Sequence, residues 1–280
     1  MSIVKSIKRI VHGVLSELRP VKMIDVHISY LTPNERLKGK NILITGGNKG
    51  IGLALAKKFT EEGANVLIAG RDEELLKKSS IDIGCRYMTL DVSDDQQIEK
   101  AIDNAVKLLG RIDVLVNNAG ISLHEGSIKN VSFSQFDSQF DVNLRGGYFL
   151  SKNFIRYCNQ TGQVNSSILF VSSECGQWVS DIPYGLTKVA INSLTQGLSR
   201  LVLREGIRVN AIAPGVTATS LVGMSGDSNL YADWQANNRI YLPEEVAEVA
   251  CFLISDVSKC ISGQIIYCNE GKSINSFRKV

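Results

Sequence analysis

The chain has no run of apolar residues long enough to cross a membrane, since a spanning helix needs about 18 to 20 in succession. Its N-terminal stretch also lacks a continuous apolar segment followed by a small-residue cleavage site, so we expect no secretory signal. Histidine is scarce, with three residues, and the six cysteines are scattered without a C-x-x-C pair. These absences exclude a zinc site and a disulfide framework from the leading interpretations. We therefore expect no bound metal, reduced thiols and a cytoplasmic protein.

Strong charge of one sign is also missing. The net charge is only +3, and no long run of lysine or arginine is present, so nucleic-acid binding gets little support. The 280 residues are 44% hydrophobic and 21% charged, which is an ordinary globular balance. A chain of this length and composition can bury the core of one large domain.

The first 38 residues differ from the rest. Apolar residues recur at helical spacing over 1–20, Lys5, Lys8 and Arg9 accompany them, and Pro20 ends the pattern. We predict an amphipathic helix and then an irregular connector to residue 38. Packing on its own domain or on a sister subunit is the favoured role, and contact of residues 1–19 with an anionic membrane surface is a less favoured alternative. Glu17 and the small number of serines disfavour a transit peptide.

From residue 39 onward, short apolar runs rich in β-branched residues alternate with helical patterns. We predict strands at 41–45, 65–69, 86–90, 112–117, 167–171, 207–213 and 264–268. We predict helices after the first glycine turn, from residue 72, and over 96–109, 133–158, 182–205 and 244–255. This alternation indicates an α/β protein with a Rossmann-type, doubly wound, mostly parallel seven-stranded sheet in a single domain over 39–280.

Ligands of such sheets bind beyond the carboxyl ends of the strands, where the strand order switches. Five residues follow strand ends and should therefore converge on one crevice: Gly46, Asp91, Asn118, Ser173 and Pro214. The first of them opens the turn Gly46-Gly-Asn-Lys-Gly-Ile-Gly52, which lies between a strand and a helix. Backbone N–H groups and the dipole at a helix N-terminus favour a pyrophosphate, so we predict a phosphate-binding turn.

Tyr184 and Lys188 are four residues apart on a predicted helix, which puts them on the same face. A free phenol has a pKa of about 10, and a neighbouring ammonium stabilises the phenolate. We therefore expect Lys188 to lower the pKa of Tyr184 and make it an acid/base group. The pair alone is weak evidence, because this spacing arises by chance in most chains.

The motifs taken together are more specific than any one of them. Their order resembles that of the classical short-chain dehydrogenase/reductase family over about residues 39–272, and the likeness is carried by Thr45-Gly46-x-x-x-Gly50-Ile51-Gly52, Asp91-Val92, Asn117-Asn118-Ala119-Gly120, Asn143, Ser173, Tyr184-x-x-x-Lys188 and Pro214-Gly215. Within that family the chain is similar to 3-oxoacyl-acyl-carrier-protein reductases and to sugar or polyol dehydrogenases.

The resemblance implies hydride transfer between a nicotinamide and a carbonyl or secondary alcohol. Tyr184 would exchange the proton, Lys188 would tune it and hold the nicotinamide ribose, Ser173 would bind the carbonyl oxygen, and Asn143 would anchor a water leading to solvent. The cofactor-binding residues implied are Gly46, Asn48, Lys49, Gly50, Ile51, Gly52, Arg71, Asp91, Val92, Asn118, Ala119, Gly120, Tyr184, Lys188, Pro214 and Gly215.

The end of the second predicted strand bears on cofactor choice. An NAD-specific site carries a carboxylate there, which bonds the ribose 2′-hydroxyl. This chain has Gly70 followed by Arg71, while Asp72 is expected to begin a helix. With Lys49 in the glycine turn, two cations suit a 2′-phosphate, so NADP(H) is the preferred cofactor and NAD(H) the alternative.

The substrate is less well defined. The pocket should be lined by His124, by residues 175–179 and by a mobile lid near 216–241. We expect an enzyme that acts on a CH–OH group with NAD(P)⁺, and its substrate would be a small ketone, a 3-oxoacyl thioester or a sugar or polyol. The alternatives are a non-catalytic dinucleotide-binding regulatory protein and, less favoured, isomerase or dehydratase chemistry. The apolar helix 182–205 leads us to expect a homodimer or homotetramer.

Overall fold

The computed structural model of the protein describes residues 34–224, 229–236 and 238–272. The amphipathic helix predicted for 1–20, with its proposed docking or membrane contact, lies outside the described residues. Within the part of the chain that is described, no helix combines the length and the apolar character needed to cross a membrane.

The described residues form one sheet of seven strands in the order β3-β2-β1-β4-β5-β6-β7. All six neighbouring pairs are parallel, which confirms the predicted doubly wound sheet. The order reverses between β1 and β4, so the crevice at the topological switch lies above the carboxyl ends of these two strands. The strands are β1 (Asn41–Thr45), β2 (Asn65–Gly70), β3 (Arg86–Thr89), β4 (Val114–Asn117), β5 (Ser166–Val171), β6 (Ile207–Pro214) and β7 (Ile265–Cys268).

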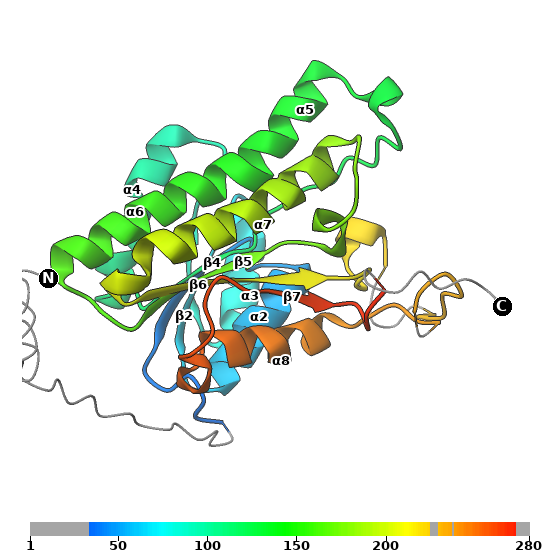
Figure 1. The fold of residues 1–280 in the computed structure, drawn as a ribbon. Helices are drawn as coiled ribbons and strands as arrows, with labels where there is room; N and C mark the ends of the chain where they lie inside the picture. The colour runs from blue at the N-terminus through cyan, green and yellow to red at the C-terminus, as the bar shows by residue number, and fades with distance from the viewer. Residues whose placement is uncertain (1–33, 225–228, 237, 273–280) are drawn as a thin grey trace, which may run out of the picture. The chain divides into compact units, whose positions relative to one another are not determined.

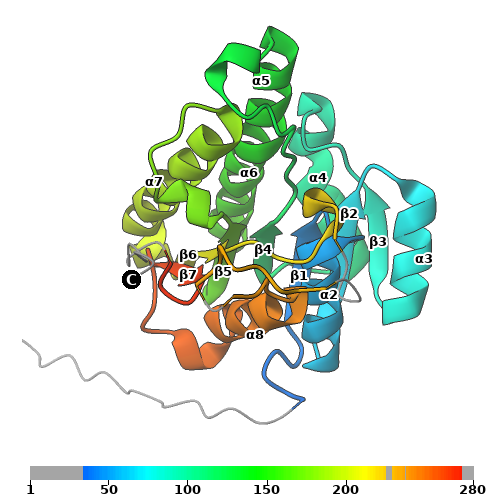
Figure 2. The same ribbon diagram turned by 90° about the vertical axis from the view of Figure 1, so that its right-hand side faces the viewer.

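Helices cover both faces of the sheet (Figures 1 and 2). One face carries α2 (Gly50–Glu61), α3 (Glu73–Ile83) and α8 (Pro243–Ile254), and the other carries α4 (Asp95–Leu109), α6 (Gly146–Thr161) and α7 (Pro183–Val202). Each face has its own buried cluster, one centred on Leu55 and Phe59 and the other on Phe154. Central strands are buried on both sides, which explains their nearly continuous apolar sequences.

The helix predicted for 133–158 is present, but a π-helical turn divides it into two α-helices. It runs as α5 (Phe133–Phe140), a π-helical turn over Asp141–Arg145, and then α6. Asn143 lies in this π-helical turn. Single π-helical turns within α-helices are frequent at functional sites. Gly146 and Gly147, in the middle of the predicted helix, are the first two residues of α6, directly after this turn.

The folded domain begins before the boundary predicted at residue 39. Leu37 is fully buried in the core, and its N–H donates to the carbonyl of Glu62 at 2.9 Å. Arg36 pairs with Glu62 at the end of α2 and with Glu248 on α8. The last residues of the predicted connector are therefore part of the domain, because their side chains close one end of it.

Candidate active site

The glycine turn between β1 and α2 leaves the start of the helix open. Lys49 occupies the N-cap position, and no side chain caps the helix. A Cβ atom on Gly52 would lie 2.2 Å from the carbonyl oxygen of Gly46, so only glycine permits this tight turn. An uncapped helix N-terminus approached by bare backbone fits a pyrophosphate group. The turn therefore has the form that a dinucleotide cofactor requires.

A cavity of about 460 Å³ runs from this turn to the middle of the sheet. Most of the residues predicted to hold the cofactor line it: Gly46, Lys49, Gly50, Ile51, Gly52, Asn118, Ala119, Gly120, Tyr184 and Lys188. Asn118 also braces the turn, since its Nδ2 donates to the carbonyls of Thr45 and Gly46 at 2.8 and 3.0 Å. Of the five residues predicted to converge, Gly46 and Asn118 line this cavity.

A second cavity, of about 310 Å³, adjoins the first and shares Tyr184 with it. Ser173, Glu174 and Cys175 from the loop after β5 line one side, and residues 214–217 after β6 line the other. Pro214 and Gly215, predicted to hold the cofactor, lie on this second cavity. Tyr184 stands where the two cavities meet, so a substrate in one and a nicotinamide in the other would both reach its hydroxyl.

The two neighbouring serines have different partners. Ser172 is buried and its Oγ donates to Oδ1 of Asn192 on α7 at 2.6 Å. Ser173 faces the second cavity, where its Oγ accepts a hydrogen bond from the N–H of Cys175 at 3.2 Å. A hydrogen bond between Ser173 and Tyr184 lowers the pKa of the tyrosine in part. Both serines are buried and line the second cavity, but Ser173 is the one whose hydroxyl lies against Tyr184.

The electrostatics of the tyrosine differ from the expectation. Burial raises the pKa of Tyr184 to about 12, although the Lys188 Nζ lies 5.6 Å from its ring centroid. The expected lowering by Lys188 is wrong for the protein alone, because removing the phenol from water disfavours the phenolate. Burial also lowers the pKa of Lys188 to about 8, and its ammonium donates to the carbonyl of Val171 at 2.9 Å. The protein alone thus holds Tyr184 as a neutral proton donor.

Asn143 bridges two segments next to this lysine. Its Oδ1 accepts from the N–H of Ile121 at 2.8 Å, and its Nδ2 donates to the carbonyl of the same residue at 2.9 Å. A Cβ on Gly120 would lie 3.4 Å from Oδ1 of Asn143 and 3.7 Å from Nζ of Lys188, so all three groups surround one point. The amide of Asn143 fixes the loop after β4 against the π-helical turn.

The remaining predicted cofactor residues do not line the large cavity. Arg71 is exposed after β2 and makes no ion pair with the described residues. Asp72 caps α3, accepting from the N–H of Leu75 at 3.0 Å, as the sequence predicts. Asp91 instead accepts hydrogen bonds from the N–H and hydroxyl of Ser93. Asn48 is buried beneath the glycine turn, next to Gly70.

Three polar residues that organise the site were missed by the sequence analysis. Thr45 accepts hydrogen bonds from the N–H groups of Asn118 and Ala119, both at 3.1 Å, and so links the ends of β1 and β4. Thr187 joins Asn143 to the carbonyl of Tyr184. Asn192 holds Ser172 and the carbonyl of Gly176. Thr187 and Asn192 had a local signal, since they lie three residues after Tyr184 and four after Lys188 on the same helix, and Thr45 stood in the glycine-turn motif without a role.

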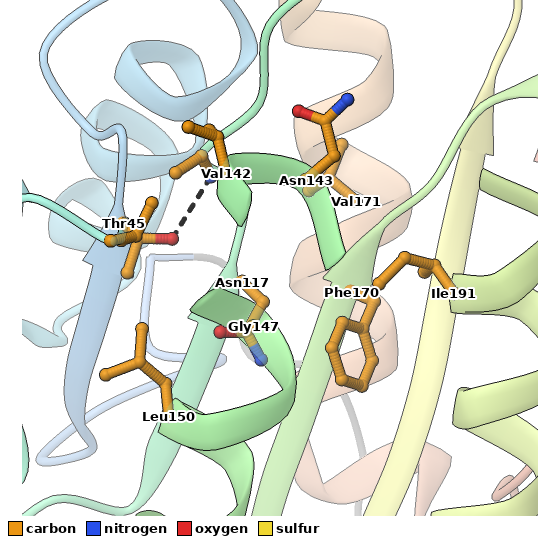
Figure 3. Close-up of a pocket in the computed structure, with 11 residues that line it drawn as sticks. Thr45, Asn117, Val142, Asn143, Gly147, Leu150, Phe170, Val171 and Ile191 are labelled. Carbon is orange, nitrogen blue, oxygen red and sulfur yellow. Dashed lines mark hydrogen bonds between the residues drawn. The ribbon is translucent and has the colours of Figure 1, made fainter. Parts of the chain in front are cut away.

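A small enclosed void lies beneath the site (Figure 3). Its volume of about 10 Å³ is close to the minimum that holds one water molecule. Thr45, Asn117 and Val142 face it, and the dashed bond in Figure 3 links Thr45 to the backbone of the loop after β4. Oδ1 of Asn117 is buried without a hydrogen-bond partner among the described residues, which makes the void polar. Val92, predicted to bind the cofactor, lines this void instead.

Comparison with known proteins gives a consistent result. The family model described as enoyl-(acyl carrier protein) reductase matches residues 46–273. The mitochondrial borneol dehydrogenase of Lavandula x intermedia is 33% identical over 244 residues, which cover 85% of this chain and 92% of the relative.

Two solved structures are also among the most similar proteins. The Brucella melitensis 3-ketoacyl-(acyl-carrier-protein) reductase complexed with NADH has a TM-score of 0.77 and 29% identity, covering 85% of this chain and all of the other. The Burkholderia cenocepacia short-chain dehydrogenase in complex with NADP has a TM-score of 0.75 and 28% identity, covering 84% and 98%. The chain belongs to the classical short-chain dehydrogenase/reductase family, and it is an oxidoreductase that uses a nicotinamide dinucleotide.

Proposed function

We propose that this short-chain dehydrogenase/reductase uses NADP(H) to interconvert a carbonyl group and a secondary alcohol on a small molecule. One observation carries the proposal: Tyr184, Ser173 and Lys188 gather where the cofactor cavity adjoins a second cavity. A bound nicotinamide would supply or accept the hydride at this junction. The second cavity would hold the carbon that exchanges it.

The roles of the side chains follow from their surroundings. In the reduction direction, the Tyr184 hydroxyl gives its proton to the carbonyl oxygen as hydride reaches the carbon. Ser173 Oγ donates a hydrogen bond to the same oxygen and holds it at the tyrosine. The Lys188 ammonium, positioned by the Val171 carbonyl, faces the phenolate that remains. Asn143 acts as a positioning residue whose amide keeps the loop before Ile121 beside this lysine.

The preference for NADP(H) rests on the charges that follow β2 and stand in the glycine turn. Gly70 ends β2 without a carboxylate, and the Asp72 carboxylate is engaged in capping α3. The exposed guanidinium of Arg71 and the ammonium of Lys49 remain to meet a 2′-phosphate. A guanidinium can bind a phosphate with two parallel hydrogen bonds, so an extra phosphate would be favoured there.

Charge reversal at Arg71 tests the cofactor preference. R71E should raise the Michaelis constant for NADPH at least tenfold and leave that for NADH within about threefold, as expected for a lost charge-assisted pair of hydrogen bonds. K78E is the matched control, because Lys78 is exposed on the adjoining helix α3 and the net charge change is the same. Equal changes for both cofactors, or equal effects of the two variants, would refute the preference.

Removal of the phenol oxygen tests the reaction itself. We expect Y184F to lose at least a thousandfold in turnover of ketones with NADPH while it still binds the cofactor, because general acid catalysis supplies factors of about 10² to 10⁴. Y148F is the control, since Tyr148 is exposed on α6. If Y184F retained activity, the assignment of Tyr184 as the proton donor would be wrong.

We also propose a homo-oligomer. Several apolar side chains of α6 and α7 are exposed, among them Leu201 at 68% and Tyr148 at 48%. Exposed apolar side chains on these helices are unfavourable in water and favour burial against another copy. Light scattering at micromolar concentration should therefore give a mass of at least two chains, and a monomer would contradict this.

A further inference from the structure

Lys272, beyond the last strand, lies between two loops that also supply residues to the second cavity. The Nζ of Lys272 lies 5.3 Å from the ring centroid of Trp178 and 5.1 Å from that of Trp234. It also pairs with Oε1 of Glu174 at 3.3 Å. Trp178 belongs to the loop between β5 and α7, whereas Trp234 belongs to the segment between β6 and α8. Lys272 therefore contacts two loops that are well separated along the chain.

The partner of this lysine is a carboxylate inside the substrate cavity. Glu174 is 3% exposed, follows Ser173 directly and lines the second cavity beside it. Its Oε2 accepts from Nδ2 of Asn269 at 3.2 Å. A Cβ on Gly215 would lie only 3.3 Å from the same oxygen, so the glycine leaves room for the carboxylate. Burying a carboxylate is unfavourable unless it is paired, and none of the roles proposed for the reaction uses it.

The cavity is otherwise poor in charge. Among the described residues that line it, no lysine or arginine is present, and Glu174 is the one carboxylate. A carboxylate offers about four acceptor positions, and the bonds from Asn269 and Lys272 take one each. Acceptor capacity thus remains on this carboxylate. Such a group attracts hydroxyl donors and repels anions.

We propose that Glu174 determines substrate specificity by accepting a hydrogen bond from a second hydroxyl group of the substrate, with Lys272 as its positioning residue. The substrate class is then an uncharged hydroxy-carbonyl compound and the corresponding diol or polyol, and anionic acyl thioesters are disfavoured. The two tryptophans hold the ammonium against Glu174, because a cation between aromatic faces is stabilised when it is withdrawn from water. The inference rests on the carbonyl reduction proposed above.

The test compares two alcohols with one carbon skeleton. Cyclohexanol and trans-1,2-cyclohexanediol are oxidised with NADP⁺, and the ratio of their kcat/KM values is measured. We expect the wild type to prefer the diol, and E174Q to reduce that ratio by roughly 10-fold, as for a hydrogen bond that loses its charged partner. A ratio that E174Q leaves unchanged overturns the proposal. So does a wild type that reduces acetoacetyl-coenzyme A faster than 2-hydroxycyclohexanone, the ketone of the diol, with NADPH.

Variants at Lys272 separate positioning from simple loss of structure. K272R keeps a cation and should retain the preference for the diol, whereas K272M should lose it mainly through KM. K259M is the matched control, because it also removes one lysine charge. Lys259 pairs with Asp256 on the surface, and it belongs to neither of the two loops that Lys272 contacts. Equal substrate ratios for K272R and K272M would remove Lys272 from the proposal.

The chain offers a direct readout of this contact. It has only two tryptophans, and both lie against Lys272. Tryptophan fluorescence should therefore change in K272M and stay close to wild type in K272R and K259M, with folding checked by circular dichroism. Unchanged fluorescence in folded K272M would contradict the arrangement. If the wild type turns over no alcohol or ketone at all with NADP(H), the proposed function fails instead.

Discussion

Replacing Gly52 by alanine is the sharpest structural test of the cofactor turn. The new Cβ would lie 2.2 Å from the carbonyl oxygen of Gly46, 2.9 Å from its carbonyl carbon and 2.4 Å from Nδ2 of Asn118. Two of these contacts are with backbone atoms, which cannot rotate away as a side chain can. Either the turn between β1 and α2 opens, or helix α2 shifts outward.

The magnitude can be built from the contacts that would be lost. Overpacking of a close-packed site costs about 1–3 kcal/mol. Displacing Asn118 would also break its bonds to the carbonyls of Thr45 and Gly46, worth about 1 kcal/mol each. Alanine returns up to about 1 kcal/mol of helix propensity. We therefore expect the free energy of unfolding to fall by about 2–4 kcal/mol, or Tm by roughly 5–15 °C.

The chain contains its own control for this substitution. Gly197 lies in α7, and no atom lies within 4 Å of the Cβ that alanine would add. G197A should raise stability by about 0.5–1 kcal/mol, since glycine in a helix costs backbone entropy. Thermal unfolding and NADPH titration of both variants give the answer. A G52A protein that is as stable and binds NADPH as tightly as the wild type would refute the steric reading of the turn.

Three further predictions concern the buried charges and the exposed apolar face. Burial lowers the pKa of Lys188 to about 8, so its charged form opposes folding at neutral pH, and K188M should raise the free energy of unfolding in urea at pH 7 by about 1–2 kcal/mol while losing activity. As pH rises from about 8 to 10, Lys188 becomes neutral in the folded protein before it does so in the unfolded chain, and the wild type should regain stability relative to K188M. A constant difference in stability across this pH range would contradict the buried cation. Because burial raises the pKa of Tyr184 to about 12, kcat/KM for alcohol oxidation, which needs the phenolate, should rise with pH from 6 to 9 while ketone reduction stays nearly flat up to pH 7.5; a flat oxidation profile would argue against Tyr184 as the base. L201E should lower the mass measured by light scattering, and an unchanged mass would remove this face from the interface.

Much of the fold was accessible from sequence because its signals are local. Each central strand is a short apolar run between turn residues, and several helices end at a glycine, such as Gly84 after α3 or Gly162 after α6. The spacing of Tyr184 and Lys188 is likewise a property of one helix. The cap of α3 by Asp72 was predicted for the same reason, since the acceptor and donor are three residues apart.

The sequence by itself therefore determined the order of strands and helices, the place of the glycine turn between β1 and α2, and the residue types available to the site. Only the tertiary structure decided the environment of those residues. The pKa of Tyr184 moves upward because burial outweighs its hydrogen bond with Ser173, and no spacing along the chain reports burial. Lys272, Trp178, Trp234 and Glu174 meet across nearly a hundred residues of sequence, because the strands that precede them end at the same edge of one parallel sheet.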